Sequence, residues 1–375
     1  MSHPLGARFR EQAQGCLPGS PLSAVLLAAM ADDLDAGGVT ADVVAGHEGD
    51  RPGTVLPLRL LAALHRLVLE GRAAGLAPYY PSVGGTAPAE AVWPAAAATM
   101  REHLGELRRL VDRTVQTNEP GRASLLFGGL LVAAERTGWP VRLLEIGSSA
   151  GLTLLVDRYG YAVGGRVLGD PASPLRFDQP WVGQPPASLN RRLHVVERRG
   201  CDPRPVDPTS AEGRLTLTSY VWADWTERIE RLRAALRVAA AMPPPVDRAT
   251  AADWLAAHLA APHQRVVTVI WHSIVWQYLD REERSAVRAV LAEAAAAATG
   301  EAPLAHLAFE PRREADRSVR FELSVSLWPG PGRPELLARA PGHGLPTRWQ
   351  ATARTAGDSP RASRCGGSRG AEQGR

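Results

Sequence analysis

The sequence predicts an α/β fold in which a helical region precedes a mostly parallel sheet of seven strands. Residues 1–137 carry apolar residues at three- and four-residue spacing, which is typical of helices. From residue 141 onward, apolar strand patterns alternate with helical patterns, as in parallel sheets. Two apolar runs after residue 318 follow each other across a Pro/Gly turn with no helix between them. We therefore expect an antiparallel hairpin at the sheet edge.

The helical region is expected to consist of helices separated by two loops. The helices are predicted over residues 21–35, 55–74, 88–114 and 122–137. The loops are "APYYPSVGGTAP", which holds two adjacent glycines, and "VQTNEPGR", which separates the last two helices. The strand pattern begins directly after the fourth helix. We therefore divide the chain into an N-terminal helical region, 1–137, and a sheet domain, 138–350.

Seven segments of the sheet domain carry strand patterns. In chain order they are VRLLEIG, LHVVERRGCD, PPPVD, RVVTVIWHS, PLAHLAFEP, SVRFELSVSLWPG and ELLARAPGHGLPTRW. A helix is predicted to begin at LTLLVDRYG, after the first strand, and others to precede or follow the third and fourth strands. Residues 160–190, rich in Gly, Pro and Asp, read as an insertion. Residues 351–375 have almost no apolar bulk and are predicted to be a disordered tail.

Composition and charge indicate a cytoplasmic protein without a nucleic-acid or membrane partner. All 43 basic residues are arginine, and acids are interleaved with them, which is typical of solvated helix faces. The best candidate for a membrane span, 22–30, is far shorter than the ~20 residues that span a bilayer and runs straight into two aspartates. The first residues lack the order of a secretory signal. Cys16, Cys201 and Cys365 are odd in number and far apart in the sequence, which fits neither a disulfide framework nor a zinc site, and no cluster has metal-ligand spacing.

The turn "EIGSSAG", residues 145–151, joins the first strand to the helix predicted after it. Gly147 permits a sharp exit from the strand, and Gly151 permits a close approach by the helix or by a ligand. Backbone N–H groups exposed at such a turn suit the polar part of a nucleotide. The pattern begins with Glu145, has Ser149 in place of the middle glycine, and resembles motif I of class I S-adenosylmethionine-dependent methyltransferases. A plain strand-to-helix turn is the alternative.

Acidic residues follow the second and third predicted strands. Asp202, in "RGCDPRP", resembles the methyltransferase acid that binds the ribose hydroxyls, with Glu197 as the alternative. Asp247, in "PVDRATAADWL", resembles the acid that accepts a hydrogen bond from the adenine amino group, with Asp253 as a second candidate. Both residues also have structural explanations, Asp202 as a turn residue before proline and Asp247 as a helix cap.

The fourth predicted strand ends in "WHSIVWQYLDREER", and its end resembles the methyltransferase segment that faces the transferred methyl group. His272 stands at the carboxyl end of this strand, where open α/β sheets place their chemistry. It is our candidate for the catalytic base on the acceptor side. Tyr278, with Trp271 and Trp276, is a candidate wall of an aromatic pocket. A histidine bonded to the backbone and tryptophans buried in the core are the structural alternatives.

A serine hydrolase is a second enzyme hypothesis. "GSSAG" matches the G-x-S-x-G pattern of a nucleophile elbow, with Ser149 as the nucleophile. Its partners would come from Asp247 with either His272 or His343. The strand before the turn is the first of the predicted sheet, whereas a hydrolase of this kind has several strands before its nucleophile.

Several segments together are similar to one known family. They are "APYYPSVGG", "VQTNEPGRA", "LLEIGSSAGL", "DRYGY", "GDPASP", "VVERRGCDPRPVDPTSAEGRLTLTSYVW" and "WHSIVWQYL". Over roughly residues 5–350 the chain resembles the actinobacterial family catalogued as domain of unknown function 2332. The resemblance implies a class I methyltransferase-like Rossmann fold with strand order 3-2-1-4-5-7-6, and it carries no established activity.

Two motifs of this family lie in the loops of the helical region. "QTNE" supplies Gln116, Asn118 and Glu119, which precede the first strand and are candidates to contact the cofactor or the substrate. "YYPSVGG" supplies Tyr80, with Tyr79, as a candidate lid. Helix capping and turn formation are the structural alternatives for both motifs.

Together these patterns lead to one expected function and two alternatives. We expect methyl transfer from S-adenosylmethionine to a small molecule. The first alternative is a Rossmann-like nucleotide-binding protein without catalysis, and the second is the serine hydrolase described above.

Overall fold

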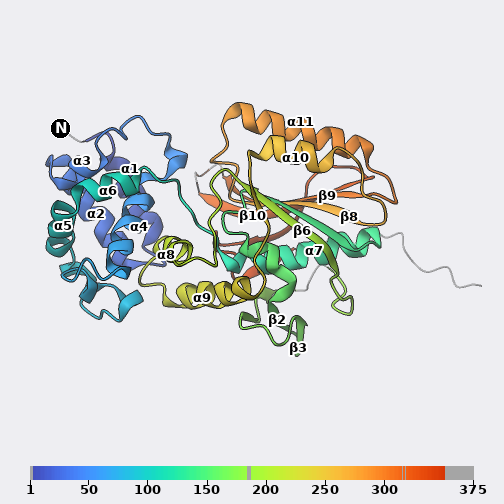
Figure 1. The fold of residues 1–375 in the computed structure, drawn as a ribbon, viewed down its shortest axis with the longest axis horizontal. Coiled ribbons are helices and arrows are strands. Elements are labelled where there is room, and N and C mark those ends of the chain that lie inside the picture. Colours follow the sequence, from blue (N-terminus) through green and yellow to red (C-terminus); the bar gives the residue numbers. More distant parts are fainter. Residues whose placement is uncertain (1–2, 184–186, 315, 317, 351–375) are drawn as a thin grey trace, which may run out of the picture.

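The computed structural model describes residues 3–183, 187–314, 316 and 318–350. A group of helices from the N-terminal part of the chain lies beside a layered α/β part, and the cover helices of the sheet occupy both of its faces (Figure 1). The predicted disordered tail, 351–375, lies outside the described residues.

The N-terminal helices pack around a core of their own. They are α1 Gly6–Cys16, α2 Pro21–Asp35, α3 Val39–Val44, α4 Leu56–Leu69, α5 Trp93–Glu102 and α6 Leu104–Val111. Ser20 caps α2, because its side chain accepts a hydrogen bond from Ser23 N–H and Pro21 occupies the first helical turn. Buried leucines, valines and alanines of these helices form one hydrophobic cluster. The helix predicted over 88–114 is divided in two at His103.

The sheet has nine strands in the described residues, two more than predicted. They are β1 Val141–Ile146, β5 Trp181–Val182, β6 Val195–Asp202, β7 Val246–Arg248, β8 Val267–Ser273, β9 Leu304–Arg313, β10 Val319–Trp328, β11 Glu335–Ala340 and β12 Thr347–Trp349. Their order is β5-β12-β11-β10-β9-β8-β1-β6-β7. The strands from β7 to β9 are parallel, so the predicted α/β fold with a mostly parallel sheet is confirmed.

Beyond β9 the expected order was wrong. In the expected order 3-2-1-4-5-7-6, the seventh strand lies between the fifth and the sixth. Instead β10 pairs with β9 and β11 pairs with β10, both antiparallel, in the order of the chain. Short connections join these strands, and a short connection favours pairing with the nearest neighbour. The last predicted strand is divided into β11 and β12, which also pair antiparallel, and β5 adds to β12 at the edge.

Two helical layers cover the sheet, and different side chains of each strand face them. Helices α7 Ala123–Thr137 and α9 Thr226–Ala241 lie on one face, and α10 Ala251–Leu259 and α11 Arg281–Ala297 on the other (Figure 1). Leu143 of β1 packs in the cluster of α7 and α9, whereas its neighbour Leu144 packs in that of α10 and α11. Although the sequence groups α7 with the N-terminal helices, it packs against the sheet.

The prediction of an α-helix directly after β1 was wrong. Residues 152–158 form a 3-10 segment, η6 Leu152–Arg158, that is interrupted at Leu155. Two buried tyrosines explain the interruption, because Tyr159 Oη donates to Leu152 O and Tyr161 Oη donates to Val156 O. The chain then enters a small sheet formed by the predicted insertion, with strands β2 Gly160–Val163, β3 Arg166–Gly169 and β4 Arg176–Asp178.

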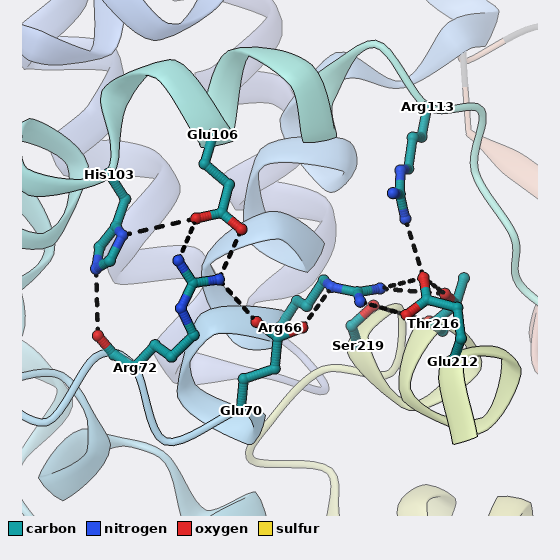
Figure 2. A network of polar contacts seen from close by, with 9 residues as sticks. All are labelled: Arg66, Glu70, Arg72, His103, Glu106, Arg113, Glu212, Thr216 and Ser219. Carbon is teal, nitrogen blue, oxygen red and sulfur yellow. Dashed lines mark hydrogen bonds and ion pairs between the residues drawn. The ribbon is translucent and has the colours of Figure 1, made fainter.

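A chain of ion pairs joins the N-terminal helices to α8 Ala211–Ser219, which precedes α9 (Figure 2). Arg66 of α4 donates to both oxygens of Glu212, at 2.9 and 2.6 Å, and Arg113 approaches the same carboxylate at 3.3 Å. Arg66 also bonds Glu70 on its own helix. One acidic residue of α8 therefore binds two arginines of the N-terminal helical region.

Glu212→Ala is expected to destabilise the protein by about 1 kcal/mol at pH 7, because it removes a forked contact between the largely buried Arg66 and an exposed carboxylate. Arg66 holds the pKa of Glu212 below its usual value, so this contribution is present above pH 4.5 and is lost as the pH falls through the pKa in the folded state. Urea unfolding of both proteins at several pH values measures the difference. Glu293→Ala, on the exposed face of α11, is the control, and equal losses from both variants would contradict the prediction.

Candidate functional site

A cleft of about 1020 Å³ opens at the carboxyl ends of β1, β6 and β8. The chain leaves β1 toward β6 on one side and later returns to β8 on the other, so the cleft lies where the strand order reverses. Gly19, Val55 and Leu58 of the N-terminal helical region also line it. Its size accommodates a nucleoside together with a small second molecule.

The turn after β1 forms part of the cleft wall. Gly147 has φ +67°, and a Cβ atom on it would lie 2.5 Å from Val275 Cγ2, in the loop after β8. Ser149 also has a positive φ, +52°, and lines the cleft. Gly151 does not line the cleft. A Cβ on Gly151 would lie 2.7 Å from Val246 Cγ2, so packing against β7 accounts for this glycine.

Glu145 is a buried carboxyl group at the end of β1 that lines the cleft. Its Oε1 accepts a hydrogen bond from Thr153 Oγ1. Its Oε2 is buried without a hydrogen-bond partner among the described residues. Burial raises the pKa of Glu145 to about 8, so the group is largely protonated at pH 7. A positive charge placed beside Oε2 would favour the ionised form.

Asp202, at the end of β6, is tied to the same turn. Its Oδ2 accepts from Ser149 N–H at 3.0 Å and its Oδ1 accepts from Arg204 N–H at 2.8 Å. Burial raises the pKa of this carboxyl. Gln116 completes the connection, because its Oε1 accepts from Ser149 Oγ at 2.6 Å and its Nε2 donates to Arg204 O at 3.2 Å. Predicted residues from three segments therefore meet at one edge of the sheet.

The other two candidate residues of the "QTNE" motif, Asn118 and Glu119, also line the cleft and bond to protein groups. Asn118 Oδ1 accepts from Leu152 N–H at 2.7 Å, which uses an N–H group at the start of η6. Glu119 accepts from Gly121 N–H at 2.8 Å and from Arg228 Nε at 2.6 Å. Burial acts to raise the pKa of Glu119, but Arg228 and Arg231 hold it below its usual value.

Aromatic side chains gather on another part of the wall, which sequence reasoning mostly missed. Trp222 and Trp225 stack with ring centroids 5.5 Å apart, and His343 meets Trp225 edge-on at 4.7 Å. Phe321 and Tyr278 also line the cleft. The closely spaced tryptophans of "SYVWADW" are the sequence signal that could have indicated this wall. Of these residues, the sequence singled out Tyr278 as a pocket wall and His343 as a hydrolase partner.

The structure places His272 behind the cleft wall rather than on it. The imidazole is buried, with Nδ1 2.7 Å from Glu310 Oε1 and Nε2 2.9 Å from His306 Nε2. Glu310 Oε1 also accepts from Val275 N–H at 3.0 Å, which holds the loop after β8. His272 therefore supports a wall of the cleft, and His343 is the histidine that lines the cleft in the described part of the chain.

Two further predicted site residues lie away from the cleft. Asp247 bonds Arg199 at 2.8 and 3.0 Å and Trp254 Nε1 at 2.8 Å, and Arg199 lowers the pKa of Asp247 to about 2. Tyr80 is buried in the core of the N-terminal helices, with its ring centroid 5.6 Å from that of His65. Both side chains serve the packing of their own regions.

The geometry around Ser149 does not form a catalytic triad. Its Oγ donates to Gln116, and no histidine of the described residues hydrogen-bonds to it. Asp247 is engaged with Arg199 and His272 with Glu310, and the third candidate, His343, forms no hydrogen bond with Ser149.

A family model described as "uncharacterized protein conserved in bacteria (DUF2332)" matches residues 6–349. The chain belongs to the DUF2332 family. The match covers both the helical region and the sheet, which together enclose the cleft. No curated protein and no solved structure matches the DUF2332 chain.

The described residues of this DUF2332 member hold neither a cluster of metal ligands nor a helix able to span a membrane. They contain no group of three or more His, Cys, Asp or Glu side chains arranged to hold a metal ion. None of the helices in the described ranges combines the length and the apolar character needed to cross a membrane.

Proposed function

We propose that this DUF2332 protein binds S-adenosylmethionine in the cleft, through a methyltransferase-like arrangement of strand ends, and transfers its methyl group to a small molecule. One observation carries the proposal. The carboxyl groups of Glu145 and Asp202, from the ends of two adjacent parallel strands, line one cleft on either side of a glycine turn. That edge of an open α/β sheet is where such folds bind nucleotides.

The residues present fit the parts of this cofactor. Each oxygen of Asp202 accepts one backbone hydrogen bond and keeps capacity for a second, which suits a ribose diol. The unpartnered Oε2 of Glu145 suits a cationic group. A pyrophosphate fits less well, because a 3-10 segment replaces the helix N-terminus and Asn118 takes one of its N–H groups.

The bound cofactor would supply a methyl carbon on a positively charged sulfur. A lone pair of the acceptor would form the new bond to that carbon, and the electron pair of the carbon–sulfur bond would go to sulfur. The chain's own contribution is to hold the acceptor in line and to exclude water. His343 Nδ1 is buried without a partner among the described residues, and burial lowers the pKa of this ring to about 4. The ring is therefore neutral at pH 7 and orients a polar group of the acceptor, whose proton leaves to solvent.

Calorimetric titration with S-adenosylmethionine and with S-adenosylhomocysteine tests the proposal, and both ligands are expected to bind. Asp202→Asn is expected to weaken both by about tenfold or more, because it removes a charged acceptor. Asp247→Asn is the matched control on the neighbouring strand β7, and it should leave both affinities unchanged. The absence of heat with either ligand, in a sample shown to be folded by circular dichroism, would overturn the proposal.

Fluorophosphonate labelling separates the serine hydrolase from this function. Because Ser149 Oγ donates to Gln116, we expect no covalent labelling of the wild-type protein. Labelling that disappears in Ser149→Ala would favour the hydrolase. Binding of both cofactor forms without turnover of any acceptor would instead favour a nucleotide-binding protein.

A further inference from the structure

Arg122 is a cation on the cleft wall without an acidic partner. Its Nε donates to Gly342 O at 2.9 Å, and its Nη1 donates to Ser273 O at 3.0 Å and to Ser273 Oγ at 3.3 Å. In the described part of the chain no carboxylate forms an ion pair with Arg122, and Nη2 bonds no other residue. A partly buried charge that bonds only neutral groups is costly, and an anionic ligand would offset that cost.

Two other arginines lie nearby and share one carboxylate, Glu119, which together with Glu310 attracts Arg122 from beyond ion-pair distance. Glu119 bonds Arg228 and also lies 3.6 Å from a guanidinium nitrogen of Arg231. The carboxylate of Glu119 therefore already serves two arginines other than Arg122. The guanidinium of Arg228 lies over the Trp225 ring, 4.8 Å from its centroid, which keeps it against the wall. Arg231 does not line the cleft and Arg228 is paired with Glu119, so Arg122 is the arginine of these three that can offer a free N–H group to a ligand in the cleft.

Aromatic rings surround the segment that Arg122 holds. Arg122 bonds the carbonyl of Gly342, and a Cβ on Gly342 would lie 3.2 Å from Phe321 Cζ. The next residue, His343, meets Trp225 edge-on. A ligand that contacts Arg122 here would also contact flat apolar surfaces, which favours a planar ring next to its anionic group.

We propose that this part of the cleft binds a small aromatic carboxylate, with the carboxylate on Arg122 Nη2 and the ring against Trp225, Phe321 and His343. Nε and Nη1 already donate to the protein, so Nη2 is left as a single charged donor group, which suits one carboxylate oxygen of a monoanion, whereas a phosphate dianion needs more donors. The role of this molecule as methyl acceptor rests on the proposed function. The binding itself does not, because its contacts are separate from those of Glu145 and Asp202.

Titration of the full-length wild-type protein tests the proposal without any substitution. The ligands are benzoate, 4-hydroxybenzoate and indole-3-acetate, each compared with its own uncharged amide, and calorimetry and tryptophan fluorescence give the affinities. At least one acid is expected to bind about tenfold or more tightly than its amide, because a charge-assisted hydrogen bond is lost in the amide. Acetate, which lacks the ring, is expected to bind far more weakly. Equal affinities for every acid and its amide would overturn the proposal, as would tighter binding of phenyl phosphate than of any carboxylate.

Arg122→Met then locates the binding. The affinity of the preferred acid should fall to that of its amide, while the affinity of the amide stays the same. Arg136→Met is the matched control, because Arg136 lies at the other end of α7 and bonds Glu335 away from the cleft. Unchanged acid affinity in a folded Arg122→Met protein would overturn the assignment of Arg122. If that variant does not fold, the comparison of acid with amide in the wild-type protein still decides.

The two proposals fail separately. If S-adenosylmethionine binds but no acid is preferred over its amide, the proposed function stands and the aromatic carboxylate is wrong. If an acid binds more tightly than its amide, and this preference depends on Arg122, but neither cofactor form binds, then the carboxylate site stands and methyl transfer is wrong.

Discussion

Gly147→Ala is expected to destabilise the protein by about 3 kcal/mol, and Gly164→Ala by about 1 kcal/mol. Both glycines have positive φ, +67° and +57°, so an alanine is strained at either position. Only at position 147 does the new Cβ also clash, because it would lie 2.5 Å from Val275 Cγ2, whereas nothing lies within 4 Å at position 164. Urea unfolding of the three proteins measures both effects. Similar losses in the two variants would contradict the close contact of the turn with Val275.

The same position also tests where the cofactor binds. A larger side chain in Gly147→Val would displace Val275 and with it the loop after β8, which lines the cleft. We expect the folded Gly147→Val protein to have no measurable affinity for S-adenosylmethionine. Gly164 lies outside the cleft, so Gly164→Val serves as the control for folding. Wild-type affinity in Gly147→Val would move the cofactor site elsewhere.

Glu145→Gln is expected to remove a pH-dependent loss of stability. Burial raises the pKa of Glu145 from 4.5 to about 8, so between these pH values the folded state holds a proton that the unfolded state has released. Stability from this group therefore falls as the pH rises toward 8. Relative to the glutamine variant, the wild-type protein should lose about 3 kcal/mol between pH 5 and pH 8.

Urea unfolding of the wild-type and Glu145→Gln proteins at pH 5, 6, 7 and 8 measures this difference. The glutamine oxygen can still accept the hydrogen bond from Thr153, so the variant retains the local geometry. Glu197→Gln, which changes a carboxylate on the adjacent strand β6, is the control and should leave the pH dependence in place. Parallel stability curves for the wild-type and Glu145→Gln proteins would show that Glu145 ionises normally in the fold.

Residues of the candidate site could be predicted from the sequence where they stand at strand ends or next to them. Glu145 and Asp202 stand at the carboxyl ends of β1 and β6, and Ser149 lies in the turn after β1; parallel strands bring their carboxyl ends to one edge of the sheet. Gln116 was found through a motif in the segment before β1. Position along a strand does not show which way a side chain points, however, and His272 turns toward β9, where His306 and Glu310 take both of its nitrogens.

The second part of the cleft could not be predicted in the same way. Arg122, Trp225 and His343 are brought together by contacts between segments more than a hundred residues apart in the chain. No periodic pattern in the sequence predicts contacts between segments so far apart in the chain. The continuous order of β9, β10 and β11 was missed for a related reason, since apolar runs indicate that strands form but not which strand each will pair with.

The far edge of the sheet joins segments that a ribosome releases at very different times. Trp181 of β5 pairs with Thr347 of β12, and the ring of Trp349 packs over Gly128 of α7 and meets Trp181 edge-on. Synthesis runs from the N-terminus, so α7 and β5 emerge long before the strand that covers them. Until β12 is made, the apolar surface of Trp181 and of α7 around Gly128 stays uncovered on the nascent chain. A chain truncated before Thr347 keeps this apolar surface exposed. Chaperones and proteases can distinguish it from the full-length protein by that surface.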